Sequence, residues 1–362
     1  MRHVKYLFST LVLLLCSATA SAYDFEVDGI YYNITSKEDL TVEVGNRDGF
    51  SDSYFGTVAI PSNVTYEEVE YSVTRIGASA FSNCRSLTSI TIPESVTSIE
   101  SSAFYGCSSL TSITIPESVT SIGASAFFNT AWYDNQPDGV IYINKVLYGY
   151  KGTMPANTSV EVKEGITFIS PRAFYRCSSL TSITIPEGVT SIESDTFNGC
   201  SSLTSITLPE SLTSIGSNAF KECYALTSIT IPEGVTSVGD MAFDDTKWFK
   251  NQADGVLYVG KVLYRYKGAM LETSFEVKEG TTEISGSAFY GCSSLTSISI
   301  PESVTRIGTS AFYYCSSLTS ITIPEGVTSI GREAFRDCLN LTSVTIPESV
   351  TSIEDWAFSS CI

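Results

Sequence analysis

Hydrophobic and polar positions recur along this chain with a period of 23 residues. The apolar positions of one repeat, residues 110–132, are Leu110, Ile113, Ile115, Val119, Ile122, Ala126 and Phe127. The alternation at its start is typical of a short β-strand, and Pro116 ends that strand. Val119 and Ile122 return to the core after a turn. Ala126-Phe127 then predicts a short helical or 3-10 turn that places the ring inside.

The phenylalanine of the repeat marks the period most clearly. It occurs at Phe81, Phe104, Phe127, Phe174, Phe197, Phe220, Phe243, Phe289, Phe312, Phe335 and Phe358. The spacing is 23 residues, except for gaps of 47 and 46 residues after Phe127 and Phe243. A short fixed period predicts a solenoid, in which each unit buries its apolar face against its neighbours. We expect eleven stacked coils, with a parallel sheet on one side and tight turns on the other.

The repeat resembles the leucine-rich repeat signature L-x-x-L-x-L, with isoleucine in place of most leucines. Its form IPxxVxxIGxxAFxxC looks like the BspA-type repeat of bacterial surface proteins over most of residues 60–362. The opening YDFEVDGIYYNIT also resembles the start of that family. The resemblance implies an α/β solenoid, a right-handed leucine-rich-repeat superhelix. It also implies adhesion to host extracellular-matrix proteins, such as fibronectin or fibrinogen, or to other bacteria.

Both ends of the chain differ from the repeat. Residues 1–22 resemble a secretory signal peptide, with cleavage expected after Ala22, although a retained anchor or a lipoprotein site at Cys16 stays open. No later segment has the ~18 apolar residues that a spanning helix needs. Residues 23–59 contain an Asp28-Gly29 hairpin signal and predict an N-terminal β cap on a repeat domain at 60–362.

Nine cysteines remain after the expected cleavage, and each lies three residues after a repeat phenylalanine. They are Cys84, Cys107, Cys177, Cys200, Cys223, Cys292, Cys315, Cys338 and Cys361. Thr130 and Thr246 take the same position after Phe127 and Phe243. We expect buried free thiols that act as small apolar groups. The coil spacing and export leave disulfides between coils as the alternative.

The two long gaps hold similar inserts at 133–156 and 249–271. Each insert predicts a β-hairpin, with turns at Asn144-Lys145 and Gly260-Lys261. Aromatic and basic side chains concentrate there, which suggests a contact surface on a protrusion from an acidic scaffold. The candidate binding residues are Trp132, Tyr133, Tyr142, Lys145, Tyr148, Tyr150, Trp248, Phe249, Tyr258, Lys261, Tyr264, Arg265 and Tyr266. The alternative is that these aromatic rings pack the hairpin onto the solenoid.

Charge and composition restrict the chemistry. The formal net charge is −18, which disfavours nucleic acid, and the single histidine, His3, lies in the expected signal peptide. Near-identical repeats supply no unique constellation for catalysis, so we expect neither an enzyme nor a cofactor or metal. A column of glutamates after the repeat proline leaves a Ca²⁺-binding edge open, and the outward Ser and Thr positions leave a glycan or peptide contact open.

These observations favour a binding protein that is secreted or held on the outer cell surface. Its expected partners are protein ligands, with host matrix proteins or other cells as the implied targets. Glycan binding by the hairpin aromatics and a structural spacer without a ligand are the two alternatives.

Overall fold

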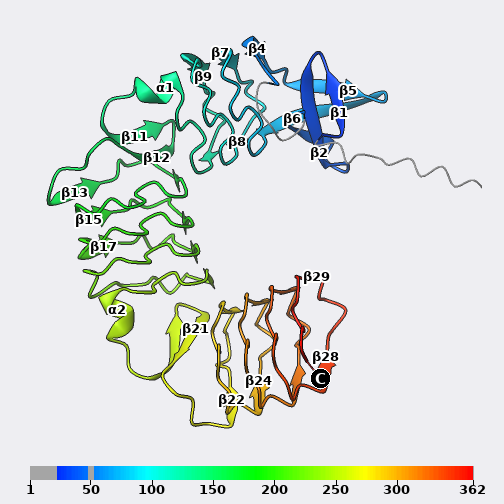
Figure 1. The fold of residues 1–362 in the computed structure, drawn as a ribbon, viewed down its shortest axis with the longest axis vertical. Coiled ribbons are helices and arrows are strands. Elements are labelled where there is room, and N and C mark those ends of the chain that lie inside the picture. Colours follow the sequence, from blue (N-terminus) through cyan, green and yellow to red (C-terminus); the bar gives the residue numbers. More distant parts are fainter. Residues whose placement is uncertain (1–22, 48–52, 362) are drawn as a thin grey trace, which may run out of the picture.

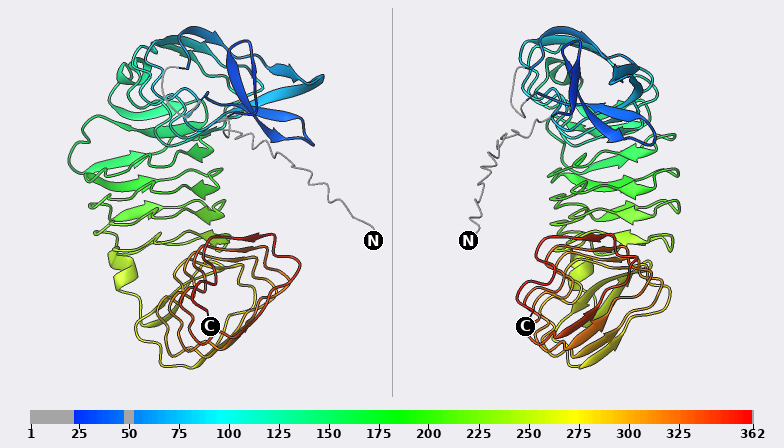
Figure 2. Two further views of the ribbon diagram at one scale, coloured as in Figure 1. Left: turned by 45° about the vertical axis from the view of Figure 1, so that its right-hand side comes forward. Right: turned by 90° about the vertical axis from the view of Figure 1, so that its right-hand side faces the viewer.

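The computed structural model describes residues 23–47 and 53–361. The expected signal peptide at residues 1–22 lies outside the described residues. The chain forms an arch of stacked coils, with the N-terminal strands and the last coils at its two ends (Figure 1). Further views show the coils stacked like rungs along the arch (Figure 2).

The N-terminal strands close one end of the stack. Strands β1 (Phe25–Val27), β2 (Ile30–Ser36) and β3 (Thr41–Val44) form an antiparallel meander. Strand β3 then pairs in parallel with β6 (Val69–Ile76), which also forms a hairpin with β5 (Asn63–Tyr66). Strand β6 pairs with the first short strand of the repeat, so these strands cover the edge that the stack would otherwise expose.

Nearly every regular coil contributes to two sets of parallel strands, where the sequence predicted one sheet. The strands of the first sheet lie on the outside of the arch and those of the second sheet line its inside (Figure 1). The outer strands are β4 (Gly56–Ala59), β7 (Leu87–Thr91), β9 (Ser112–Thr114), β13 (Thr158–Glu161), β15 (Leu180–Thr184), β17 (Ser205–Thr207), β22 (Ser274–Glu276), β24 (Ser297–Ser299), β26 (Ser320–Thr322) and β28 (Ser343–Thr345). The inner strands are β8 (Ser98–Ile99), β10 (Ser121–Ile122), β14 (Phe168–Ile169), β16 (Ser191–Ile192), β18 (Ser214–Ile215), β19 (Ser237–Val238), β23 (Glu283–Ile284), β25 (Arg306–Ile307), β27 (Ser329–Ile330) and β29 (Ser352–Ile353).

The register between coils follows the period of the sequence. Ile90 pairs with Ile113 in the outer sheet, and Ile76 pairs with Ile99 in the inner sheet. A shift by one residue would turn every buried isoleucine toward solvent, so the apolar pattern holds this register. The solenoid of stacked coils predicted from the period is confirmed.

The turn that carries the repeat phenylalanine is not helical. The residues two before and two after Phe104, Ser102 and Gly106, have φ angles of 57° and 72°. This left-handed conformation interrupts a right-handed helix on both sides of the ring. Successive turns are bonded to each other instead, because the Phe104 amide donates to the Ala126 carbonyl at 2.8 Å. The described residues contain two α-helices, α1 (Ala131–Asp134) and α2 (Lys247–Lys250).

The core consists of stacked phenylalanine rings and the aliphatic side chains around them. Phe81, Phe104 and Phe127 stack with centroids 5.0 and 5.5 Å apart. The rings from Phe174 to Phe243 form a second ladder, and those from Phe289 to Phe358 form a third. The buried apolar residues accordingly form three clusters, which meet at the two hairpins.

The two predicted hairpins are confirmed as β11 (Gly139–Ile143) with β12 (Val146–Lys151), and β20 (Gly255–Val259) with β21 (Val262–Lys267). The expectation that they protrude from the scaffold is wrong. Strands β12 and β21 pair in parallel with the inner strands β14 and β23 of the following coils. Strands β12 and β21 thus take the place of the inner strand in their coils. The continuous sheet ends before each hairpin, and the stacking direction changes there (Figure 1).

Two aromatic clefts at the hairpins

Each hairpin coil lacks the turn that carries a repeat phenylalanine. In a regular coil, a backbone carbonyl of that turn accepts a hydrogen bond from the preceding phenylalanine amide. A tyrosine hydroxyl takes the place of this carbonyl in the hairpin coils. The Phe127 amide donates to the Tyr148 hydroxyl at 2.9 Å, where an ordinary coil would offer an alanine carbonyl. The Phe243 amide donates to the Tyr264 hydroxyl at 3.1 Å in the same way. Burial raises the pKa of both phenols. These two predicted binding residues therefore lie inside the core.

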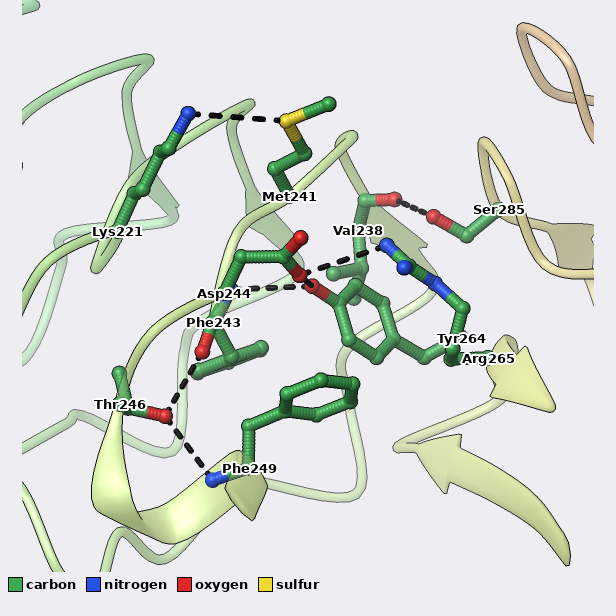
Figure 3. A network of polar contacts seen from close by, with 10 residues as sticks. All are labelled: Lys221, Val238, Met241, Phe243, Asp244, Thr246, Phe249, Tyr264, Arg265 and Ser285. Carbon is green, nitrogen blue, oxygen red and sulfur yellow. Dashed lines mark hydrogen bonds and ion pairs between the residues drawn. The ribbon is translucent and has the colours of Figure 1, made fainter. Parts of the chain in front are cut away.

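The threonines in the cysteine column have a related role. In regular coils the thiol donates to a carbonyl of the preceding coil, as Cys107 Sγ does to Phe81 at 2.8 Å. Thr130 instead donates to the Phe127 carbonyl of its own coil at 2.8 Å and accepts from the Tyr133 amide at 3.0 Å. It thereby caps α1, and Thr246 caps α2 with the same contacts (Figure 3).

Trp132 and Trp248 cover the last rings of the first and second phenylalanine ladders. Trp132 lies 5.0 Å from Phe127, and Trp248 lies 4.8 Å from Phe243, measured between ring centroids. Each replaces the next phenylalanine that the hairpin coil does not supply. Both indoles are half-buried, and their main contact is with the core.

Four of the remaining aromatic residues, Tyr133, Tyr150, Phe249 and Tyr266, line two clefts in equivalent positions. The first cleft, of about 250 Å³, lies between Phe128, Tyr133, Tyr150, Arg172 and Tyr175. The second cleft, of about 500 Å³, lies beside its hairpin and has a lining of similar composition. It is lined by Met241, Phe249, Arg265, Tyr266, Lys267, Gly268, Ser287 and Tyr290. Corresponding residues in the two linings are offset by 116 positions up to the hairpin, as in Tyr150 and Tyr266, and by 115 after it, as in Tyr175 and Tyr290.

The clefts combine predicted residues with others that the sequence analysis missed. The predicted residues among the lining are Tyr133, Tyr148, Tyr150, Phe249, Arg265 and Tyr266. The missed residues come from the coils on either side of the hairpin: Phe128, Arg172, Tyr175, Met241 and Tyr290. A signal was present, because Phe128, Tyr175 and Tyr290 directly follow a repeat phenylalanine and are exposed by 45%, 38% and 55%.

Tyr142, Lys145, Tyr258 and Lys261 do not line either cleft. The Tyr258 hydroxyl accepts the Lys278 amide at 3.0 Å, and Lys163 lies over the Tyr142 ring at 4.3 Å. Lys145 and Lys261 are exposed at the hairpin turns. The structure thus separates these residues from the clefts.

The second cleft contains a charged network that the first lacks. Asp244 Oδ1 accepts from the Tyr264 hydroxyl at 3.1 Å and from Arg265 Nη2 at 3.4 Å (Figure 3). The equivalent positions at the first cleft are Phe128 and Gly149. The two clefts therefore share their shape-forming aromatic residues and differ in charge.

Cationic side chains lie over several of the exposed rings. Arg172 and Arg176 lie 5.4 and 5.2 Å from the Tyr175 centroid. Arg265 and Lys267 lie 5.8 and 5.9 Å from the Phe249 centroid. Such contacts are favourable and cover ring faces. A sugar ring that needs a free aromatic face would have to displace them.

The cysteines, hydroxyls and glutamates show ordinary structural contacts. All nine described cysteines are free thiols. Threonine hydroxyls beside the strands donate to the preceding coil, as Thr204 does to the Thr181 carbonyl at 3.0 Å. Within residues 23–47 and 53–361, no three His, Cys, Asp or Glu side chains are grouped to hold a metal ion. The same ranges contain no helix that is long and apolar enough to cross a membrane.

Stacked parallel coils with one buried phenylalanine each, closed by a β cap, define a leucine-rich-repeat solenoid. A family model described as a BspA type leucine rich repeat region matches residues 46–148, 148–252 and 264–362. The chain belongs to this family, which confirms the resemblance of its repeats.

Two solved structures are similar over nearly the whole chain. A leucine-rich repeat protein from Bacteroides ovatus is 32% identical, with 94% of this chain and 93% of that chain covered and a TM-score of 0.34. A leucine rich cell surface protein from Faecalibacterium prausnitzii is 31% identical, with 93% and 92% covered and the same TM-score of 0.34. No curated protein gives a significant match.

Proposed function

We propose that this chain is an exported surface protein that binds protein ligands through the two clefts. The main support is their duplication. A similar set of aromatic residues is exposed at two positions of one scaffold, whereas most other coils carry small or polar residues after the repeat phenylalanine. Two clefts on one chain can bind a repetitive ligand with avidity.

The cationic side chains that lie over the aromatic rings favour a protein over a glycan as the ligand. Glycan recognition by aromatic residues requires open ring faces, and cations lie over Tyr175 and Phe249. Tyrosine and arginine together are typical of the centre of protein–protein interfaces. Adhesion to host matrix proteins or to other cells is the specific role that we propose.

Deleting the hairpins would be a poor test, because each one is a coil of the solenoid. Substitutions of exposed residues are better, and the repeat itself supplies the replacements. We suggest Phe128→Ser and Tyr175→Asn for the first cleft, with Met241→Ser and Tyr290→Asn for the second. Other coils carry Ser and Asn at these positions, so the fold should persist. The control carries Tyr224→Ser and Leu339→Ser, at residues that are 47% exposed and lie outside both clefts.

Residues 23–362 and these variants would be tested on immobilised fibronectin, fibrinogen and a panel of polysaccharides. Binding to a protein that the cleft variants lose and the control keeps supports the proposal. Binding to a polysaccharide that free sugar competes away would replace it with glycan recognition. Binding to none of the surfaces would favour a structural spacer.

A further inference from the structure

The two clefts differ in the side chains that a ligand would meet at their centre. The lining of the second cleft includes Arg265 and Lys267 and no carboxylate, within a chain of net charge −18. Lys221 lies at its rim, with Nζ 3.8 Å from the Met241 sulfur (Figure 3). The first cleft is lined by one cation, Arg172. The charge of the second cleft therefore complements an acidic group.

Arg265 is held in place before any ligand arrives. Its side chain is 18% exposed, and its guanidinium lies 5.4 Å from the Tyr264 ring and 5.8 Å from the Phe249 ring. Asp244 accepts one hydrogen bond from Nη2, and Nε has no hydrogen-bond partner among the described residues. Nε is buried, so a ligand carboxylate would pair with the Nη donors that Asp244 does not take. A fixed guanidinium loses little conformational entropy when it binds a carboxylate.

Other charged groups nearby leave Arg265 as the main determinant. Asp244, which is 24% exposed, orients Arg265, and Asp244 and Asp240 both offset part of its charge. Lys267 Nζ donates to the Lys250 carbonyl at 2.7 Å and is anchored to the hairpin coil. Glu272 accepts the Tyr266 hydroxyl at 2.6 Å, outside the cleft lining.

We propose that the second cleft binds an aspartate or glutamate side chain of an extended ligand segment, next to an apolar or aromatic side chain, and that Arg265 confers this specificity. The first cleft, with Phe128 and Gly149 at the equivalent positions, accepts an uncharged apolar side chain. This inference rests on the proposed function, because it assigns ligand chemistry to the same clefts. Met241 and Tyr290 contact the apolar neighbour, and the guanidinium pairs with the carboxylate.

The duplication provides matched variants. Arg265→Gln removes the charge alone, and Asp244→Phe with Arg265→Gly gives the second cleft the residues of the first. The reciprocal pair, Phe128→Asp with Gly149→Arg, gives the first cleft the residues of the second. A Cβ atom at Gly149 would lie 3.4 Å from the Ala173 carbonyl oxygen, which is close van der Waals contact without a collision. Thermal melts establish that each variant is folded.

The probe is a phage-displayed library of random linear peptides, selected on the intact chain and on the cleft variants above. Peptides that depend on Met241 and Tyr290 are synthesised, each with a partner in which Asp or Glu becomes Asn or Gln. We expect affinity to fall roughly tenfold or more on loss of the carboxylate. That difference should vanish in Arg265→Gln and should arise at the first cleft in the reciprocal variant.

The outcomes distinguish the two proposals. If peptides bind the second cleft and their amide partners bind equally well, carboxylate recognition is overturned while protein binding stands. If no selected peptide depends on either cleft, the proposed function fails and the inference fails with it. A charge effect that persists unchanged in Arg265→Gln would assign the specificity to another cation and overturn the role of Arg265.

Discussion

The carboxylate of Asp240 lies directly against the backbone of Gly286, so that a Cβ atom at Gly286 would collide with Oδ1. This pair joins the last coil before the second hairpin to the first coil after it. Gly286→Ala should therefore destabilise the fold, by about 1–3 kcal/mol, because Asp240 would have to move. Urea unfolding of the variant measures the loss.

The double variant tests the cause. Ala124 takes the place of Asp240 at the first hairpin. Asp240→Ala removes the colliding carboxylate, so Gly286→Ala should cost far less in that background. An equal cost in both backgrounds would mean that the backbone at 286, and not Asp240, requires glycine.

Tyr148 should contribute to stability through its hydroxyl. Tyr148→Phe leaves the Phe127 amide buried and unpaired, since its acceptor is the phenolic oxygen. We expect a loss of about 1–3 kcal/mol in the free energy of unfolding. Tyr150→Phe, at a half-buried ring in the first cleft, is the control and should change stability by less than about 0.5 kcal/mol. Similar losses for both variants would contradict the role assigned to Tyr148.

Glu283 should make stability depend on pH. It is 3% exposed and pairs with Arg306 at 2.7 Å, with Asp240 nearby. Burial raises its pKa, and the attraction of Arg306 offsets only part of that effect. The folded chain thus holds this proton more tightly than the unfolded chain does. The resulting stabilisation is present below the usual glutamate pKa and is lost as pH rises through the raised value.

The measurement compares the chain with Glu283→Gln by urea unfolding at several pH values. The stability of the original chain relative to the variant should fall as pH rises, by about 1.4 kcal/mol for each unit of pKa elevation. Glu302→Gln, at an exposed position, is the control for the substitution itself. A difference that stays constant with pH would contradict the prediction.

The cysteine thiols should be unreactive in the folded chain. Burial raises the pKa of Cys177 and of Cys292 to about 11, so little thiolate is present at neutral pH. We expect slow maleimide labelling of the half-buried Cys177 and Cys361, and negligible labelling of the other described cysteines. Mass spectrometry before and after unfolding, without reductant, counts the free thiols. Thiols that stay unlabelled after unfolding would indicate disulfides.

The repeat made the architecture predictable, because a 23-residue apolar period allows little besides stacked coils. The second sheet was missed for a simple reason. Its strands, such as Ser98–Ile99, are two residues long and too short to show alternation. The helical or 3-10 turn predicted at the phenylalanine was wrong, since the left-handed conformations at Ser102 and Gly106 depend on bonds between successive turns.

The clefts were harder to predict than the hairpins. The hairpin turns follow from local sequence, whereas the pairing of Leu147 with Ile169 in the next coil does not. Tyr148 and Tyr150 both border the first cleft, and sequence alone could not show that Tyr148 also serves the core, where its hydroxyl accepts from the Phe127 amide. The role of Tyr148 depends on its position in the hairpin coil, where the phenylalanine turn is absent. Tyr175 enters the cleft from a separate coil, so its place there does not follow from the local sequence of the hairpin.

The three phenylalanine ladders also bear on how the chain responds to force. Each ladder belongs to a separate apolar cluster, and the hairpins mark where those clusters meet. Coils within a cluster support one another, since repeat units are stabilised mainly by their neighbours. A chain pulled from its two ends should therefore extend in three cooperative steps, one for each ladder. A protein that tethers a cell would in this way release length under shear while the remaining ladders stay folded.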